Sequence, residues 1–249
     1  MTFITSHRGA RDLWPENSLG GFRKVLALDV DAVEFDVHLT DAGELLVIHD
    51  ATLDRTSDGA GPARALTPEK RATVRLRDCD ETIPTLADVL EALAPAADKR
   101  LHVEIKSDPD GRAYDGIVER VVAEIDRHDL RARCHLTSFD VSVLEECRRV
   151  AADIPRLVSL NAAWANRQGG IEAFLTRVDA LVDIVAVHHE LMGSKWDEIA
   201  TIVPAENLCV WTLNDEALIR KWLDHGIGHL TTDRPDLALS LRAQRRAAA

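Results

Sequence analysis

Cysteine is scarce and scattered in this chain of 249 residues. Its four cysteines stand at positions 79, 134, 147 and 209. None of them has the close paired spacing of a zinc site or of a dense disulfide framework. We therefore expect neither zinc nor disulfides, and this cysteine usage favours a reducing cytoplasm.

Long apolar runs and an excess of basic charge are also missing. No segment has about 18 uninterrupted apolar residues, the length that a membrane span needs. Met1–Ile4 leads directly into a polar His-Arg-Gly turn and not into an apolar signal core. The 30 basic and 42 acidic residues give a formal net charge of −12, which argues against a nucleic-acid partner because phosphate backbones select basic surfaces. We expect no stable membrane insertion and no nucleic acid.

What the sequence does contain is a regular alternation of short apolar runs and amphipathic stretches. Candidate strands cover residues 3–7, 32–38, 101–106, 134–138, 156–160, 183–188, 208–212 and 229–232. Apolar residues recur at helical spacing between them, for example over 117–125 and 218–223. Repeated strand–helix units predict a parallel sheet, and eight of them predict an α/β fold closed into a TIM (βα)8 barrel.

One interval interrupts this rhythm. Residues 40–83 contain an extra short strand, 45–48, and then a loop rich in Gly, Ala, Pro and Arg. We interpret the interval as a small insertion after the second strand of a single domain that spans residues 1–249. Thr85, with Asp88 three residues later, is expected to cap the helix that follows. The basic tail at 242–246 is expected to fray.

Two of the predicted strands carry carboxylates on one face. Because side chains alternate along a strand, Glu34 and Asp36 share a face with His38, and Glu104 shares a face with Lys106. Several ionisable groups in a barrel mouth are costly unless a cation compensates them. Glu34, Asp36 and Glu104 together predict an all-oxygen site for one divalent metal, Mg²⁺ or Ca²⁺, with Mn²⁺ as a further option. The alternative is a set of solvated carboxylates paired with Arg or Lys.

Two histidines stand beside these strands. His7 ends the first strand, and His49 ends the extra strand of the insertion. Histidines near a metal can divide general acid and general base work, since imidazole titrates near neutrality. Arg8 offers a planar fork for a phosphate, and Lys106 offers a point charge. A lone histidine is more often structural, so this prediction depends on the neighbouring residues.

The chain resembles the glycerophosphodiester phosphodiesterase family in nine short motifs that occur in order. They are His7-Arg8-Gly9, Pro15-Glu16-Asn17-Ser18, Glu34-x-Asp36, Thr40 through His49-Asp50, Leu53-Asp54-Arg55-Thr56, Ile83-Pro84-Thr85-Leu86, Glu104-Ile105-Lys106, Trp211-Thr212-Leu213-Asn214 and Thr232-Asp233-Arg234-Pro235. A lone His-Arg-Gly would be a weak signal. The ordered series covers residues 5 to about 238 and is very specific.

The resemblance implies a metal-dependent hydrolase of glycerophosphodiesters that yields glycerol 3-phosphate and an alcohol, as part of glycerol and lipid metabolism. It implies that His7 and His49 are the acid/base pair, that Glu34, Asp36 and Glu104 hold the metal, and that Arg8 and Lys106 contact the phosphate. It also implies a route in which the glycerol 2-hydroxyl attacks phosphorus and water then opens a cyclic phosphate. Direct attack by water is the competing route.

Other positions have less certain roles. Trp211 is expected to form a wall of the substrate site or part of the core, and Asn17 to support the metal site. His188 is expected at a strand end, where it either reaches the substrate or remains an ordinary polar residue. Ala42 replaces the Asp that the family usually has before its Gly, a change that concerns turn geometry.

Two rival functions remain. Lysophospholipase D-like enzymes, which form cyclic phosphates, share the barrel, the histidines and the acidic triad, but typically lack the Glu-Asn-Ser and Trp-Thr-x-Asn motifs. A non-catalytic barrel that binds phosphate ligands is the other alternative, although no metal or histidine position is lost. The departing alcohol, the choice between Mg²⁺ and Ca²⁺, the histidine that acts first as base and the oligomeric state stay open.

Overall fold

The computed structural model describes residues 1–248. Its strands are β1 (Phe3–Ser6), β2 (Ala32–Leu39), β3 (Leu45–Val47), β4 (Arg100–Ile105), β5 (Cys134–Ser138), β6 (Arg156–Leu160), β7 (Ile184–His188), β8 (Leu208–Trp211) and β9 (His229–Thr232). Its helices are α1 (Leu19–Val25), α2 (Pro68–Arg71), α3 (Leu86–Leu93), α4 (Ile117–Arg127), α5 (Val141–Val150), α6 (Ala162–Arg167), α7 (Ile171–Val178), α8 (His189–Ala200), α9 (Glu216–Asp224) and α10 (Pro235–Ala248).

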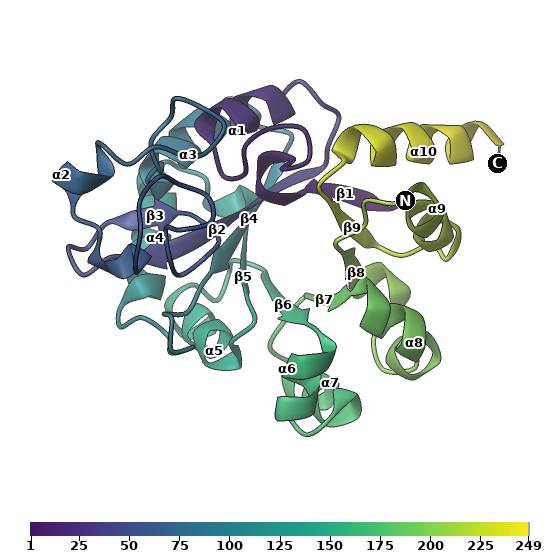
Figure 1. The fold of residues 1–249 in the computed structure, drawn as a ribbon. Helices are drawn as coiled ribbons and strands as arrows, with labels where there is room; N and C mark the ends of the chain where they lie inside the picture. Colours follow the sequence, from purple (N-terminus) through teal and green to yellow (C-terminus); the bar gives the residue numbers. More distant parts are fainter. Residues whose placement is uncertain (249) are drawn as a thin grey trace.

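The strands close into a barrel. Pairing runs in the order β1-β9-β8-β7-β6-β5-β4-β2, and β1 also pairs with β2. Every one of these pairings is parallel. Figure 1 shows the helices arranged around the outside of the strands. The predicted TIM barrel is confirmed, and its eight predicted strands match the observed ones to within one residue at each end.

The two faces of β2 show how the sequence produces this arrangement. Val33, Phe35 and Val37 are fully buried and belong to the large apolar cluster beneath the surrounding helices. Glu34 and Asp36 alternate with them and therefore face the barrel interior. Pairing of β2 with β4 continues the polar face, because Glu34 lies opposite His102 and Asp36 opposite Glu104. The interior of the barrel is thus polar along β2 and β4.

Helix α3 begins as the sequence predicts. The Thr85 hydroxyl accepts a hydrogen bond from the backbone N–H of Asp88, and the Asp88 carboxylate accepts one from the backbone N–H of Thr85. This reciprocal capping box satisfies two N–H groups that a helix start would otherwise leave unpaired. The buried face of α3 then packs against the core through four apolar residues, Leu86, Val89, Leu90 and Leu93.

The insertion after β2 has its own small core. β3 pairs antiparallel with the end of β2, with Leu39 opposite Leu45. Leu46, Ile48 and Leu53 belong to a separate apolar cluster of buried residues that continues through Ile83. This packing fixes the chain immediately before His49 and so determines where that histidine lies.

The prediction of a frayed basic tail is wrong. Helix α10 runs to Ala248 and packs against β1, as Figure 1 shows. Arg242 is buried, donates to the carbonyl oxygens of Thr2 and Asp29, and pairs with Asp31. The arginine therefore anchors the end of the chain to the bottom of the barrel. Basic composition suggested a solvated tail, but these partners are distant in sequence.

Candidate active site

The three carboxylates predicted to form a metal site meet at the carboxyl end of the barrel. Asp36 lies opposite Glu104 across the β2–β4 pairing, and Glu34 precedes Asp36 on the same face. One oxygen of each carboxylate lies within 4.8 Å of the others. Glu34 and Asp36 are 6% and 1% exposed. The cluster is therefore enclosed by protein and is not a solvated set of surface carboxylates.

The charges in this cluster are unevenly balanced. Burial, together with repulsion by Asp36 and Glu104, raises the pKa of Glu34 well above its usual value. Burial also acts to raise the pKa of Asp36, but Lys106 and Arg8 outweigh it and hold that pKa well below its usual value. Oε1 of Glu34 is buried and has no hydrogen-bond partner within residues 1–248. Oxygen donors with excess negative charge fit a hard divalent cation.

The two cations expected to contact phosphate both lie against the carboxylates. Lys106 Nζ is 2.7 Å from Glu104 Oε1 and 3.3 Å from Asp36 Oδ1. Arg8 Nε is 3.2 Å from Asp36 Oδ2. Burial acts to lower the pKa of Lys106, but Glu104 and Asp36 outweigh it and raise that pKa above its usual value. Both cations therefore remain charged beside the cluster.

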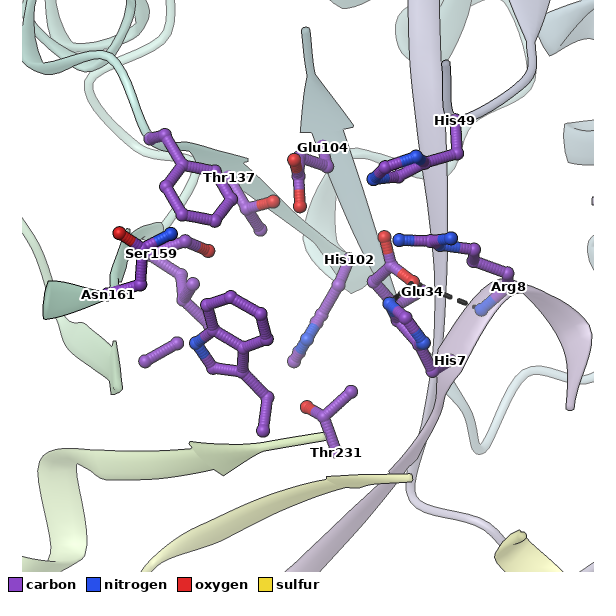
Figure 2. A pocket seen from close by; sticks show the side chains of 14 residues that line it. His7, Arg8, Glu34, His49, His102, Glu104, Thr137, Ser159, Asn161 and Thr231 are labelled. Carbon is purple, nitrogen blue, oxygen red and sulfur yellow. Dashed lines mark hydrogen bonds and ion pairs between the residues drawn. The ribbon is translucent and has the colours of Figure 1, made fainter. Parts of the chain in front are cut away.

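A sharp turn after β1 brings Arg8 to this position. Its backbone is left-handed, with φ of 50°, which is uncommon for a residue other than glycine. The backbone N–H of Arg8 donates to Glu34 Oε2 at 3.1 Å, drawn as a dashed line in Figure 2. Gly9 follows with φ of 74° and lies so close to Phe22 that an added Cβ would be 3.1 Å from that ring. The turn therefore requires a glycine beside a strained arginine.

His7 is held by an aspartate from the other end of the chain. His7 Nδ1 donates to Asp233 Oδ1 at 2.6 Å, and the other carboxylate oxygen accepts from Asn214 Nδ2 at 2.7 Å and pairs with Arg11 at 2.9 Å. Burial acts to raise the pKa of Asp233, but the hydrogen bond from His7 outweighs it and the pKa is lowered. The carboxylate is thus ionised and fixes the proton on Nδ1. Nε2 then faces Glu34 at 3.8 Å as a free acceptor.

His49 has an equivalent support from its neighbour in sequence. His49 Nδ1 donates to Asp50 Oδ1 at 2.6 Å, and Asp50 Oδ2 accepts from Arg55 at 2.6 Å. Burial lowers the pKa of His49, so the ring is neutral and can accept a proton. Burial acts to raise the pKa of Asp50, but Arg55 and His49 lower it to about 2. His38 Nε2 donates to the backbone carbonyl of His49 at 3.1 Å.

Glu16 lies between the groups that hold the two histidines, and its neighbour Asn17 contacts the carboxylate cluster. Glu16 accepts two hydrogen bonds from Arg55, at 2.7 and 2.8 Å, and lies 3.4 Å from an Arg8 nitrogen. It also lies 4.0 Å from Arg11, the residue that pairs with Asp233. Asn17 donates to Asp36 Oδ2 at 3.0 Å. The residues that hold the two histidines are therefore linked through one partly buried glutamate, Glu16, next to the carboxylate cluster.

A cavity of about 350 Å³ opens beside these groups. His7, Arg8, Glu34 and His49 line one side, and Thr137, Ser159 and Asn161 line the opposite side, as Figure 2 shows. Trp211 also lines the cavity. His188 does not, and its ring centroid lies 5.0 Å from that of Trp211. The structure thus brings every predicted acid/base and metal-ligand residue to one cavity except Asp36, which lies in the cluster beneath it.

Sequence reasoning assigned no role to several residues of this site. Asn214 and Asp233 stand in the last two motifs of the family series. Asp50 stands directly after His49 in the same motif, and Arg55 stands in the motif that follows. Their membership in those motifs was the available signal. What the sequence could not show is that Asp233 reaches His7 across 226 positions. His38 belongs to no motif, and only the fold reveals its contact with His49.

Fold and site together place this protein among the TIM-barrel hydrolases. The model of the glycerophosphoryl diester phosphodiesterase family matches residues 7–237. The chain belongs to this family.

Individual relatives agree with that assignment. A glycerophosphodiester phosphodiesterase of Bacillus altitudinis is 28% identical over 98% of this chain and 99% of its own. One of Caldanaerobacter subterraneus subsp. tengcongensis is 33% identical, but the match spans 60% of this chain and 63% of that protein. A crystal structure of a candidate glycerophosphoryl diester phosphodiesterase from Agrobacterium tumefaciens str. C58 has 30% identity and a TM-score of 0.88, and covers 99% of both chains.

A further solved structure shares the fold and contains a small molecule. The Oleispira antarctica phosphodiesterase was solved in complex with its product, sn-glycerol-3-phosphate. It has 23% identity and a TM-score of 0.79, and covers 97% of this chain and 96% of that one. At this identity the likeness shows the fold.

None of the helices in residues 1–248 combines the length and the apolar character needed to cross a bilayer.

Proposed function

We propose that this enzyme hydrolyses glycerophosphodiesters to glycerol 3-phosphate and an alcohol, using one divalent metal and two histidines. The observation that carries the proposal is the pair of histidine–aspartate contacts, each 2.6 Å long, beside three clustered carboxylates. The product complex of the Oleispira relative supports glycerol 3-phosphate as the product.

Glu34, Asp36 and Glu104 would hold the metal. The unpartnered Oε1 of Glu34 and the raised pKa of the same residue both indicate a position that a cation would relieve. Mg²⁺ and Ca²⁺ suit this oxygen donor set, and Mn²⁺ is a further option. When bound, such an ion supplies Lewis-acid stabilisation of negative charge on phosphate and glycerol oxygens.

Arg8 and Lys106 are the proposed phosphate contacts. Both stay charged, and both border cavities that adjoin the cluster. Arg8 can present two N–H groups to a phosphate, whereas Lys106 acts as a point charge. Each side chain also holds a carboxylate of the cluster in place. They would therefore link the position of the phosphate to that of the metal ligands.

The histidines would move the protons. With Nδ1 of each ring held by an aspartate, each Nε2 is free to act as acceptor or, once protonated, as donor. One histidine accepts the proton of the glycerol 2-hydroxyl as that oxygen bonds to phosphorus, and the other donates a proton to the departing alcohol oxygen. Water then opens the cyclic phosphate, with the two proton transfers reversed.

The insertion and the barrel would act as a single domain. His49 comes from the insertion, whereas His7 and the three carboxylates come from barrel strands or the turn after β1. Neither part holds both histidines. Asn17 and Trp211 would support the metal site and form a wall of the cavity, respectively. His188 would act only indirectly, through its contact with Trp211.

Replacing the histidines tests this mechanism. His7→Ala and His49→Ala should each lower the rate of glycerol 3-phosphate release by at least about 100-fold, the usual scale for an acid/base group. His128→Ala is a matched control, because among residues 1–248 that ring hydrogen-bonds and ion-pairs only with Glu124, near the carboxyl-terminal end of α4. Near-normal turnover by both site variants in folded samples would refute the acid/base assignment.

A further inference from the structure

We propose that a pocket lined by Arg11, Arg55 and Arg77 is a second phosphate site, separate from the catalytic cavity, at which a bound phosphate group slows catalysis. This arginine pocket has a volume of about 190 Å³ and shares no lining residue with the cavity of about 350 Å³ that the histidines line. It is smaller than the roughly 300–1,000 Å³ of ordinary organic-ligand pockets, which favours a small anion. The effect on turnover rests on the proposed function, whereas binding of the anion does not.

The arginine pocket is locally positive in a chain whose net charge is −12. Its three arginines outnumber its two carboxylates, Glu16 and Asp78. Arg55 directs all three of its guanidinium nitrogens at Glu16 and Asp50, so these side chains satisfy one another. Burial acts to raise the pKa of Glu16, but Arg55 and Arg8 outweigh it and lower that pKa. The positive charge available to a ligand therefore comes from the other two arginines.

Arg11 and Arg77 both retain N–H groups that residues 1–248 do not use. Arg11 pairs through Nε with Asp233 at 2.9 Å, and its Nη1 is 4.0 Å from Glu16, beyond hydrogen-bond range. Arg77 donates through Nη2 to the carbonyl oxygen of Asp54 at 3.0 Å and has no ion pair within the described residues. A guanidinium is a planar fork that matches the oxygens of a phosphate group. Two such forks on one small pocket make phosphate the anion that fits it best.

One carboxylate of the arginine pocket opposes an anion. Asp78 is exposed, and its carboxylate forms no hydrogen bond or ion pair within residues 1–248. Its φ of 62° is left-handed, a conformation that asparagine adopts about as readily as aspartate. Asp78→Asn therefore removes a repulsive charge from the pocket while the backbone can stay as it is.

Two arginines of the pocket also hold the aspartates that orient the catalytic histidines. Arg55 binds Asp50, and Arg11 pairs with Asp233, the carboxylate that accepts from His7. A phosphate group bound by Arg11 competes with Asp233 for the same guanidinium and so weakens the hold on the His7 ring. Binding in the pocket and a well-oriented His7 therefore oppose each other, which is a coupling between two sites. Occupancy should lower kcat and should not depend on displacing the substrate.

Equilibrium dialysis of the full-length protein with labelled inorganic phosphate, in the presence of Mg²⁺, tests the site directly. Arg77→Ala should weaken binding in the pocket at least about tenfold, the scale of a hydrogen bond between charged groups. Asp78→Asn should strengthen it about threefold, since a nearby like charge is removed. Arg75→Ala is the matched control and should bind as the wild-type protein does. Arg75 also donates to one backbone carbonyl, that of Asp80, but does not line the pocket.

Steady-state kinetics test the effect on catalysis, with inorganic phosphate and glycerol 3-phosphate added separately and release of the alcohol as the readout. Each anion should raise KM through the catalytic cavity and, at saturation, lower wild-type kcat about fivefold or more, the lower end of usual coupling between sites. Arg77→Ala should keep the wild-type kcat without added anion and should lose only the fall in kcat. A larger effect of glycerol 3-phosphate would identify the reaction product as the source of the phosphate group, and equal effects would identify phosphate alone.

The outcomes separate this inference from the proposed function. Phosphate binding that Arg77→Ala and Asp78→Asn change no more than Arg75→Ala does would overturn the inference. An effect of both anions on KM alone would also overturn it, because phosphate would then act only in the catalytic cavity. If no glycerophosphodiester is hydrolysed, the proposed function fails, and dialysis of the same variants still decides whether the arginine pocket binds phosphate.

Discussion

The imidazole of His7 and the carboxylate of Asp233 come from opposite ends of the chain and lie 2.6 Å apart. β1 and β9 are neighbours in the closed barrel, with Ser6 opposite Thr232. The residue after each strand therefore reaches the same side of the site. Closure of the barrel thus creates a histidine–aspartate pair that the order of the sequence does not suggest.

The first prediction concerns this pair. Asp233→Asn removes the carboxylate that holds the proton on His7 Nδ1, and the ring can then present the wrong tautomer to the substrate. We expect kcat to fall by about 10² to 10⁴, as for other histidines that lose an orienting aspartate. Steady-state kinetics across a pH series provide the measurement, because a change in tautomer and charge should also move the pH profile.

Asp12→Asn is a suitable control for this variant, because it removes a nearby carboxylate for which no hydrogen bond or ion pair with the described residues is seen. If Asp233→Asn reduced stability but left both kcat and the pH profile intact, Asp233 would have a structural role only.

The second prediction concerns Lys106 and the metal-free protein. Lys106 is paired with the buried Asp36 and the partly buried Glu104, and both of these carboxylates repel Glu34. Lys106→Met should lower the free energy of unfolding of the metal-free protein by about 3 kcal/mol, since loss of one partner leaves buried charge unpaired. Saturating divalent metal should recover part of this loss, because the added cation again neutralises the cluster. Urea unfolding with and without metal measures both effects.

Lys70→Met is the matched control, because Lys70 is exposed on α2 and should change the unfolding free energy little. An equal loss for Lys106→Met in the presence and absence of metal would show that Lys106 does not compensate the cluster.

The third prediction concerns stability in acid. Burial is the main cause that lowers the pKa of His38, His135 and His229 to about 4, from an ordinary value of 6.5. Between pH 6.5 and about 4, these three histidines bind protons in the unfolded chain but stay neutral in the folded protein. The free energy of unfolding should therefore fall as the pH drops from about 6.5 towards 4, by about 1 kcal/mol per pH unit for each histidine.

His135→Gln tests this contribution, since glutamine keeps a polar side chain but does not titrate. Its free energy of unfolding should depend less steeply on pH in the same window, measured by urea unfolding at several pH values. Identical slopes for the variant and the wild-type protein would contradict the account of His135.

The fold was largely predictable because its signals are local. The alternation along 32–38 predicts both the strand and the face that Glu34 and Asp36 share, and Thr85 with Asp88 predicts the start of α3. Parallel pairing then brings Glu104 opposite Asp36 without further information. Glu34, Asp36 and Glu104 could be grouped from the sequence because side chains alternate with a period of two along each strand.

The rest of the site depends on contacts between distant segments. Glu16 joins Arg8, Arg11 and Arg55 only after the turn that follows β1 folds against the insertion. Arg242 looked like part of a solvated tail because its partners lie more than 200 positions away. A cavity of about 420 Å³ next to the first lies where the insertion and the loops after β4 and β5 meet α6, and no local sequence pattern predicts that these distant segments come together.

The most direct test of the proposed function is glycerol 3-phosphate release by protein first stripped of metal and then resupplied with Mg²⁺, Ca²⁺ or Mn²⁺ separately. A panel of glycerophosphodiesters would serve as substrates. We predict no release from the stripped protein and recovery of activity with at least one of these ions, because Glu34, Asp36 and Glu104 form an all-oxygen cluster in which the first two are buried and Glu104 is partly buried. Full turnover by protein shown to be free of metal, or no turnover with any of the three ions in a folded sample, would contradict it.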